Sequence, residues 1–113
     1  MTESFKIQNV EVGNGKLFFL LGPCALESEE FAWSMARSVH EIASRLGIPF
    51  LFKASYDKAN RTSGTSFRGP GVKEGCRILA AIGKDLGVPV TTDVHTAQEA
   101  EIAGEHIDLL QVP

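Results

Sequence analysis

A short repeat in the sequence limits the fold more than any other feature. Leu46-Gly47-Ile48-Pro49-Phe50 matches Leu86-Gly87-Val88-Pro89-Val90 at a spacing of 40 residues. In both copies an amphipathic segment ends at the glycine and an apolar run follows the proline, which is typical of a helix that leads into a strand. Repeated units of strand, loop and helix give parallel strands with right-handed crossovers. We therefore predict an α/β fold.

The pattern around the repeat predicts four strands and three helices. The apolar runs predict strands near residues 16–21, 50–54, 88–94 and 107–112. Helical spacing of apolar residues predicts helices that end near residues 46 and 86, followed by a short third helix. Ser28 is expected to cap the first helix, and Thr96 with Glu99 fits a capping box for the third. Strand 16–21 is apolar on both faces, which indicates a central strand of a covered parallel sheet.

The N-terminal segment has a different pattern. Residues 5–12 alternate between apolar and polar side chains, and Gly13-Asn14-Gly15 separates them from strand 16–21. This order predicts a strand, a tight turn and a second strand. We expect residues 1–16 to form an N-terminal β-hairpin or cap, and residues 17–113 to form an incomplete domain of strands and helices.

Polar side chains follow every predicted strand of this domain. They are Cys24 after the first strand, Lys53 and Lys58 after the second, Asp93 and His95 after the third, and Gln111 at the fourth. A (β/α)₈ TIM barrel builds its active site from that rim. An open sheet would concentrate its site at one switch point, and the sequence has neither a dinucleotide fingerprint nor a P-loop. Because a barrel takes roughly 200 residues or more, we expect residues 17–113 to form the first half of one. We expect this half to be inactive on its own.

Charge and hydropathy exclude several classes of protein. The formal charge is −3 over 113 residues, which argues against a general nucleic-acid binder. Five cations and one anion lie between Lys53 and Lys73, which predicts that an anion binds there. The longest apolar run, residues 17–26, contains Gly22 and Pro23 and is too short for a membrane helix of about 20 residues. The N-terminus lacks an export signal, so we expect a cytoplasmic protein.

Three positions of the predicted rim suggest chemistry. Lys53 ends an apolar strand and lies close to Lys58, which suits a phosphate or carboxylate, although a solvated loop explains surface cations equally well. Asp93 and His95 are two residues apart and so share a side of the strand; they could bind a sugar hydroxyl, move a proton or cap backbone amides. Cys24 alone is more often a buried structural thiol than a metal ligand.

Five segments together resemble the 3-deoxy-D-manno-octulosonate 8-phosphate (KDO 8-phosphate) synthase family. The segments are Gly22-Pro23-Cys24-Ala25-Leu26-Glu27-Ser28, Phe52-Lys53-Ala54-Ser55-Tyr56-Asp57-Lys58-Ala59-Asn60-Arg61, Ser66-Phe67-Arg68-Gly69-Pro70-Gly71, Thr92-Asp93-Val94-His95 and Leu110-Gln111-Val112-Pro113. The resemblance implies a (β/α)₈ barrel, usually a homotetramer. It would condense phosphoenolpyruvate with arabinose 5-phosphate and water, giving KDO 8-phosphate and phosphate for lipopolysaccharide biosynthesis.

The resemblance also implies roles for individual residues. Lys53 and Lys58 would hold the phosphate and carboxylate of phosphoenolpyruvate, with Lys58 and Asp93 as the catalytic candidates. Asp93 would bind the sugar hydroxyls. The other implied substrate-binding positions are Ser55, Gln111 on the phosphoenolpyruvate side, and Asn60, Arg61 and Ser63 at the arabinose 5-phosphate end.

A metal is implied by the same resemblance. Metal-dependent members of the family carry Cys after Gly-Pro and metal-independent members carry Asn, so Cys24 implies a divalent metal whose other ligands come from beyond residue 113. Two alternatives stay open. One is the related synthase that uses erythrose 4-phosphate (3-deoxy-7-phosphoheptulonate synthase), whose loop usually reads KPRTS where this chain has KANR. The other is a fragment that binds a phosphorylated ligand without catalysis.

Overall fold

A four-stranded parallel sheet forms the centre of the structure, a computed structural model that describes residues 3–58 and 69–113. The strands are β3 (Phe19–Leu21), β4 (Phe50–Lys53), β5 (Val90–Asp93) and β6 (Leu109–Gln111). They lie side by side in chain order, and every neighbouring pair is parallel. The predictions of an α/β fold and of a parallel sheet are therefore confirmed.

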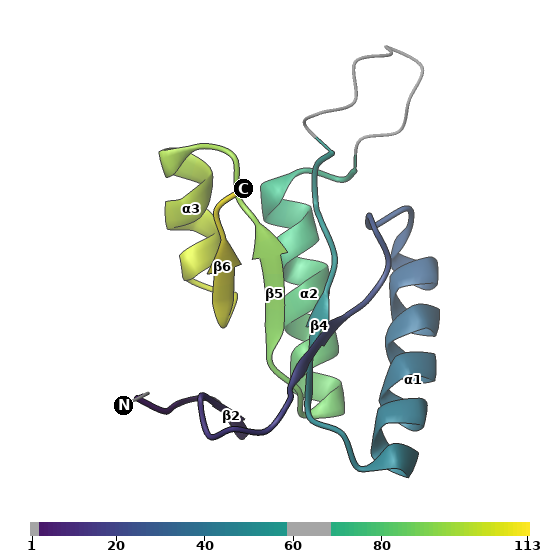
Figure 1. The fold of residues 1–113 in the computed structure, drawn as a ribbon. Helices are drawn as coiled ribbons and strands as arrows, with labels where there is room; N and C mark the ends of the chain where they lie inside the picture. The colour runs from purple at the N-terminus through teal and green to yellow at the C-terminus, as the bar shows by residue number, and fades with distance from the viewer. Residues whose placement is uncertain (1–2, 59–68) are drawn as a thin grey trace.

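Three helices cover one face of this sheet (Figure 1). They are α1 (Glu29–Leu46), α2 (Val72–Leu86) and α3 (Ala97–Gly104). Both glycines of the repeat end a helix in the left-handed conformation, Gly47 at φ 66° and Gly87 at φ 67°. Ser28 caps α1 by accepting the backbone N–H of Phe31 at 3.0 Å. The repeat therefore predicts both the helix ends and the strands that follow them.

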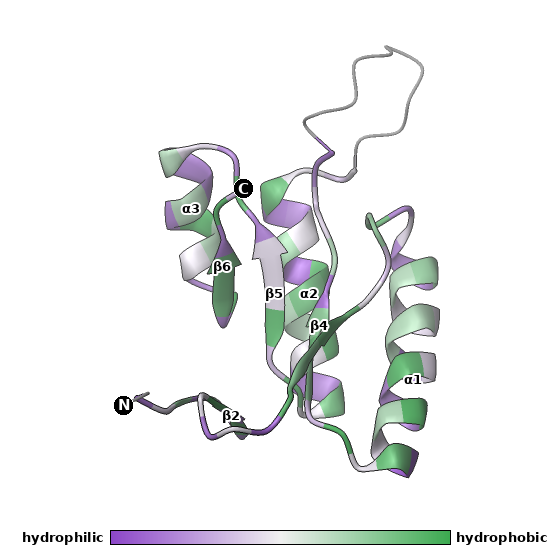
Figure 2. Cartoon of the chain, in the orientation of Figure 1, coloured by the Kyte–Doolittle hydropathy of each residue, from purple (hydrophilic) through white to green (hydrophobic). Residues whose placement is uncertain are grey.

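The strands alternate between two environments, as extended chains do. Phe52 and Val90 point into the core beneath the helices, whereas Leu51 contacts the hydrophobic cluster beneath the N-terminal segment. β5 is hydrophobic at its start and hydrophilic at its carboxyl end (Figure 2). Lys53 and Asp93 each lie an odd number of residues after a core position, so they belong to the face opposite the helices.

The N-terminal segment differs from its prediction. Residues 5–12 form two short antiparallel strands, β1 (Phe5–Ile7) and β2 (Val10–Val12), which turn at Gln8 with φ 53°. The prediction of one strand over residues 5–12 with its turn at 13–15 is wrong. Ile7 and Val10 flank the turn, and both are buried against Leu51 of β4. This packing places the turn at Gln8, although Gln8 is not a glycine.

The first strand of the sheet also differs from its prediction. Within the described residues β3 pairs with β4 alone and lies at one edge, so the prediction of a central strand is wrong for this structure. Leu20, in register with Leu51 on the face opposite the helices, is 42% exposed. Ile42 and Leu46, which belong to the apolar stripe of α1, are also exposed. None of the described helices has the length and apolar character of a membrane span.

Gly22 allows the carboxyl ends of β3 and β4 to approach each other. A β-carbon at this position would overlap the carbonyl oxygen of Lys53. We expect Gly22→Ala to force the two strand ends apart and to lower the free energy of unfolding of the full-length protein by about 2 kcal/mol. Chemical denaturation measures this change.

Gly104→Ala is the matched control for that substitution. Gly104 lies at the end of α3, where a β-carbon would meet open space, so alanine is expected to change the free energy of unfolding by less than about 0.5 kcal/mol. Equal stability of the Gly22→Ala and Gly104→Ala proteins would contradict the close approach of the two strands.

Candidate active site

The carboxyl ends of the parallel strands bring the predicted residues to one edge of the sheet. Lys53 is the last residue of β4 and Asp93 the last of β5, and Asp93 pairs in register with Gln111 of β6. The chain after β3 continues alongside the chain after β4, since Ala25 and Ser55 form an isolated parallel bridge. The strand ends therefore place these polar side chains on neighbouring positions of a single edge.

A chain of hydrogen bonds joins three of the predicted residues. The ammonium group of Lys58 donates to Ser55 Oγ at 2.9 Å, and Ser55 Oγ donates to Asp93 Oδ1 at 2.5 Å. Ser55 is fully buried and Asp93 is 9% exposed. The serine hydroxyl therefore connects the positive charge of Lys58 to the negative charge of Asp93 in a place largely closed to water, where such contacts are stronger than at the surface.

His95 extends this chain on the other side of Asp93. Its Nε2 lies 3.3 Å from Asp93 Oδ2 and 3.0 Å from the carbonyl oxygen of Asp57. Since both neighbours are acceptors, the geometry fits a proton on Nε2 that is shared between them. The expectation that Asp93 and His95 face the same side of their strand is confirmed. The imidazole thus links the end of β5 to the segment that carries Lys58.

Two cationic groups remain available to a ligand at this edge. Among the residues that the structure describes, the ammonium group of Lys53 has neither a hydrogen bond nor an ion pair, and Lys58 uses one of its three N–H donors on Ser55. Both lysine side chains are only partly exposed. Ammonium groups bind phosphates and carboxylates, so each of these two lysines can bind such an anion.

Three predicted residues lie outside the described part of the chain. They are Asn60, Arg61 and Ser63. Their roles at the sugar phosphate therefore stay predictions. The residues on either side, Lys58 and Gly69, are described.

Cys24 lies after β3 and its side chain is exposed. In residues 3–58 and 69–113, no three His, Cys, Asp or Glu side chains are grouped as a metal site would require. A metal ion in a protein usually has three or more protein ligands. Within the described residues Cys24 is therefore not part of a complete donor set.

The second cysteine has no access to solvent. Cys76 lies on the inner face of α2, and burial raises the pKa of its thiol to about 11. After chelation, at about pH 8, we expect iodoacetamide to alkylate Cys24 in the native protein and to leave Cys76 unmodified until the protein unfolds. Peptide mass spectrometry separates the two sites. Alkylation of both cysteines at equal rates would contradict the packing of α2.

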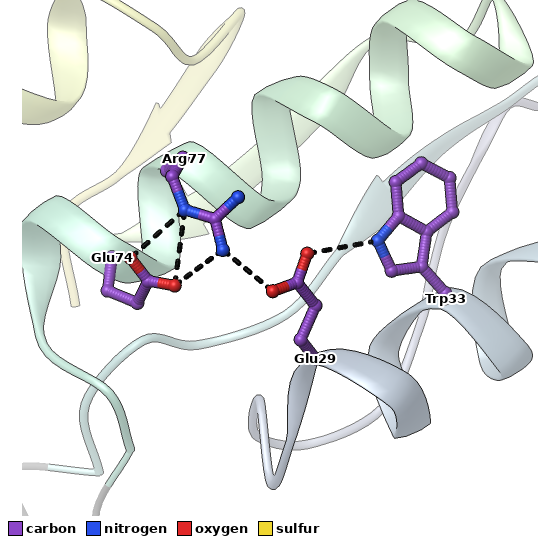
Figure 3. A network of polar contacts seen from close by, with 4 residues as sticks. All are labelled: Glu29, Trp33, Glu74 and Arg77. Carbon is purple, nitrogen blue, oxygen red and sulfur yellow. Dashed lines mark hydrogen bonds and ion pairs between the residues drawn. The ribbon is translucent and has the colours of Figure 1, made fainter.

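A second polar network lies on the outer surface, at the N-terminal ends of α1 and α2. Arg77 of α2 binds Glu74 in its own helix and reaches Glu29 of α1 at 2.7 Å, while the indole of Trp33 donates to Glu29 (Figure 3). The guanidinium group lowers the pKa of Glu74. These side chains are about half exposed, so the network contributes little to stability, as is usual for surface ion pairs. We interpret it as a link between α1 and α2 rather than as a site.

Sequence reasoning missed the contact between Tyr56 and Glu99. The phenol of Tyr56 donates to Glu99 Oε1 at 2.5 Å, and burial together with this bond raises the pKa of Tyr56 far above its ordinary value. The capping box is only half confirmed, because Thr96 accepts the N–H of Glu99 while the carboxylate turns to Tyr56 instead of to the N-cap. The available signal was a tyrosine directly after the predicted site residue Ser55.

Comparison with known proteins gives consistent names. A family model described as the DAHP synthetase I family matches residues 2–113. A 2-dehydro-3-deoxyphosphooctonate aldolase of Koribacter versatilis is 52% identical over all of this chain and 41% of its own length. Proteins of the same name from Methylibium petroleiphilum and Geobacter metallireducens are 52% and 47% identical, over 96% and 100% of this chain. The chain spans about two fifths of the length of these relatives.

Proposed function

The chain belongs to the DAHP synthetase I family, and we propose that the full-length protein condenses phosphoenolpyruvate with arabinose 5-phosphate and water. The products are KDO 8-phosphate and inorganic phosphate, and the reaction serves lipopolysaccharide biosynthesis. A carbon–carbon bond forms between the methylene carbon of phosphoenolpyruvate and the aldehyde carbon of the sugar. Water adds at the carbon that carries the phosphate, which then leaves.

The observation that carries this proposal is the chain from Lys58 through Ser55 to Asp93. It places an ammonium group beside a buried carboxylate, so that one site can bind an anion and hydroxyl groups together. Lys53 and Lys58 would bind the phosphate and carboxylate of phosphoenolpyruvate. Asp93, oriented by Ser55 and His95, would accept hydrogen bonds from the sugar hydroxyls.

Gln111 completes the described part of the proposed site. It pairs with Asp93 in register at the end of β6, and its exposed side chain would donate to phosphoenolpyruvate. In this proposal Lys58 is the residue that acts on the reacting atoms, because its ammonium group can stabilise negative charge that develops as the new bond forms.

The choice of sugar is supported by the names of the relatives. An octonate has eight carbons, which a three-carbon and a five-carbon substrate supply together, whereas erythrose 4-phosphate would give a seven-carbon product. We expect the full-length enzyme to release phosphate from phosphoenolpyruvate with arabinose 5-phosphate and to turn over erythrose 4-phosphate at least about 100-fold more slowly. Faster turnover of the four-carbon sugar would favour the heptulonate synthase. Binding without turnover would favour the non-catalytic alternative.

We propose further that the full-length protein is a (β/α)₈ barrel, with residues 1–16 as its N-terminal cap and residues 17–113 as its first half. Strands in chain order with helices on one face are supporting observations. A hollow beside β3 and α1 also supports this proposal. It is lined by apolar side chains that include Leu21, Met35 and Val39, and another strand and helix could pack there. The proposed assembly is a homotetramer, which light scattering of the purified protein can measure.

A further inference from the structure

Tyr56 lies in the middle of the proposed site without facing it. It stands between Ser55 and Asp57, and only 1% of its surface is exposed. The side chain of Tyr56 belongs to the core beneath the helices, while the atoms of its two neighbours contact Lys58, Asp93 and His95. A movement of the tyrosine would carry both neighbours with it.

The hydroxyl group of Tyr56 is held by α3. It donates to Glu99 Oε1 at 2.5 Å, and Thr96 fixes the backbone N–H of Glu99 at 3.1 Å. A glutamate at this position of a helix commonly turns back to the N-cap backbone. Here the same carboxylate reaches across to the end of β4, so the first turn of α3 is tied to the segment that carries Lys58.

The ring of Tyr56 supports His95. The two rings meet edge to face, with their centroids 5.9 Å apart and an angle of 70° between their planes. His95 in turn contacts the carbonyl of Asp57 and the carboxylate of Asp93. The position of the tyrosine ring therefore limits where the imidazole can lie between these two oxygens.

The backbone of Tyr56 is held by the start of α2. Its carbonyl oxygen accepts the N–H of Gly71 at 3.2 Å. A β-carbon on Gly75 would overlap the β-carbon of Tyr56, so the helix passes as close as a glycine permits. Two helices thus fix one residue, α2 through its backbone and β-carbon, and α3 through its hydroxyl.

From these contacts we propose that Tyr56 and Glu99 are positioning residues for the reaction. Their hydrogen bond holds the Ser55–Lys58 segment in the place where the ammonium group of Lys58 and the carboxylate of Asp93 face one ligand. The inference rests on the proposed function and adds two residues that do not touch the substrates. It assigns to α3 an effect on phosphoenolpyruvate binding, although α3 carries none of the proposed ligands.

Kinetics of variants of the full-length enzyme test this inference. Tyr56→Phe and Glu99→Ala are each expected to raise the KM for phosphoenolpyruvate about tenfold, with a smaller change in kcat. Glu99→Gln keeps an acceptor for the phenol and is expected to restore most of the affinity. A purely structural role would lower the fraction of active enzyme and therefore kcat, while KM would stay at the wild-type value.

Two further variants sharpen the result. The double variant Tyr56→Phe with Glu99→Ala is expected to resemble the single variants, because both remove one hydrogen bond. Glu74→Ala removes a surface glutamate from the first turn of α2 and is expected to leave KM unchanged. A wild-type KM in both Tyr56→Phe and Glu99→Ala would overturn the inference.

The ring resonances of His95 give a readout that does not depend on activity. Within the described residues Glu99 has no hydrogen bond or ion pair with His95, yet Glu99→Ala is expected to shift the imidazole signals in a histidine-labelled protein, through the movement of Tyr56. Glu99→Gln removes the same charge but keeps an acceptor for the phenol, so it is expected to leave these signals near their wild-type positions. His95→Gln identifies the signals. A wild-type enzyme without condensation activity would refute the proposed function. Even then, shifted His95 signals in the Glu99→Ala protein would support the effect of Glu99 on His95 through Tyr56. Unchanged His95 signals would overturn it.

Discussion

Lys58→Ala in the full-length enzyme is expected to lower kcat/KM for phosphoenolpyruvate by about 10³-fold. Removal of one preorganised donor from a catalytic site costs about 10² to 10³ in rate, and Lys58 also binds the substrate in the proposed site. The substitution has a second consequence in the unliganded protein. Ser55 loses the ammonium group that it accepts from, so the carboxylate of Asp93 keeps its serine donor but loses the nearby positive charge. Steady-state kinetics at saturating arabinose 5-phosphate measure the loss.

Lys73→Ala is the matched control for Lys58→Ala. Lys73 is an exposed lysine in the first turn of α2, so its removal takes away the same charge without a place in the proposed site. We expect wild-type kinetics from this variant. A Lys58→Ala enzyme that retains more than about a tenth of wild-type kcat/KM would contradict the catalytic role of the lysine.

The parts of the fold that the sequence predicts are those determined by local chemistry. Gly47 and Gly87 end their helices because a left-handed residue is needed there, and Ser28 caps a helix through a contact three residues away. The turn at Gln8 has no such signal, since Gly13 and Gly15 nearby are stronger turn formers. It is set by the burial of Ile7 and Val10 against β4, a contact between segments far apart in the chain.

In the candidate site, too, some features follow from local sequence and others depend on contacts between distant segments. Position at a strand end was enough to predict that Lys53, Asp93 and Gln111 lie at one edge of the sheet, because parallel strands align their carboxyl ends. The bond between Ser55 and Asp93 depends on the register of β4 against β5, which no local pattern encodes. Glu99 shows the limit of a local rule, because the capping box predicted a contact within α3 and the buried phenol of Tyr56 took its carboxylate.

A divalent metal, which the family resemblance implies, gives a second prediction with a large expected effect. We propose that Cys24 supplies one ligand of a divalent metal ion in the full-length protein, since its thiol is exposed and follows the edge strand at the same end as the proposed site. A bound divalent ion can polarise a carbonyl group or a water molecule. We expect about one ion per subunit in the purified protein, and content near background in the Cys24→Ala variant. Elemental analysis by mass spectrometry measures both.

Cys76→Ala separates the metal role of Cys24 from the loss of a thiol in general. Cys76 is buried on the inner face of α2, so its thiol has no access to an ion that enters from solvent. This variant is expected to keep its metal. Chelation should abolish activity in the wild type and added divalent metal should restore it. Full activity after exhaustive chelation, or equal metal content in the Cys24→Ala and Cys76→Ala proteins, would remove Cys24 from the proposed site and leave the lysines and Asp93 to act without it.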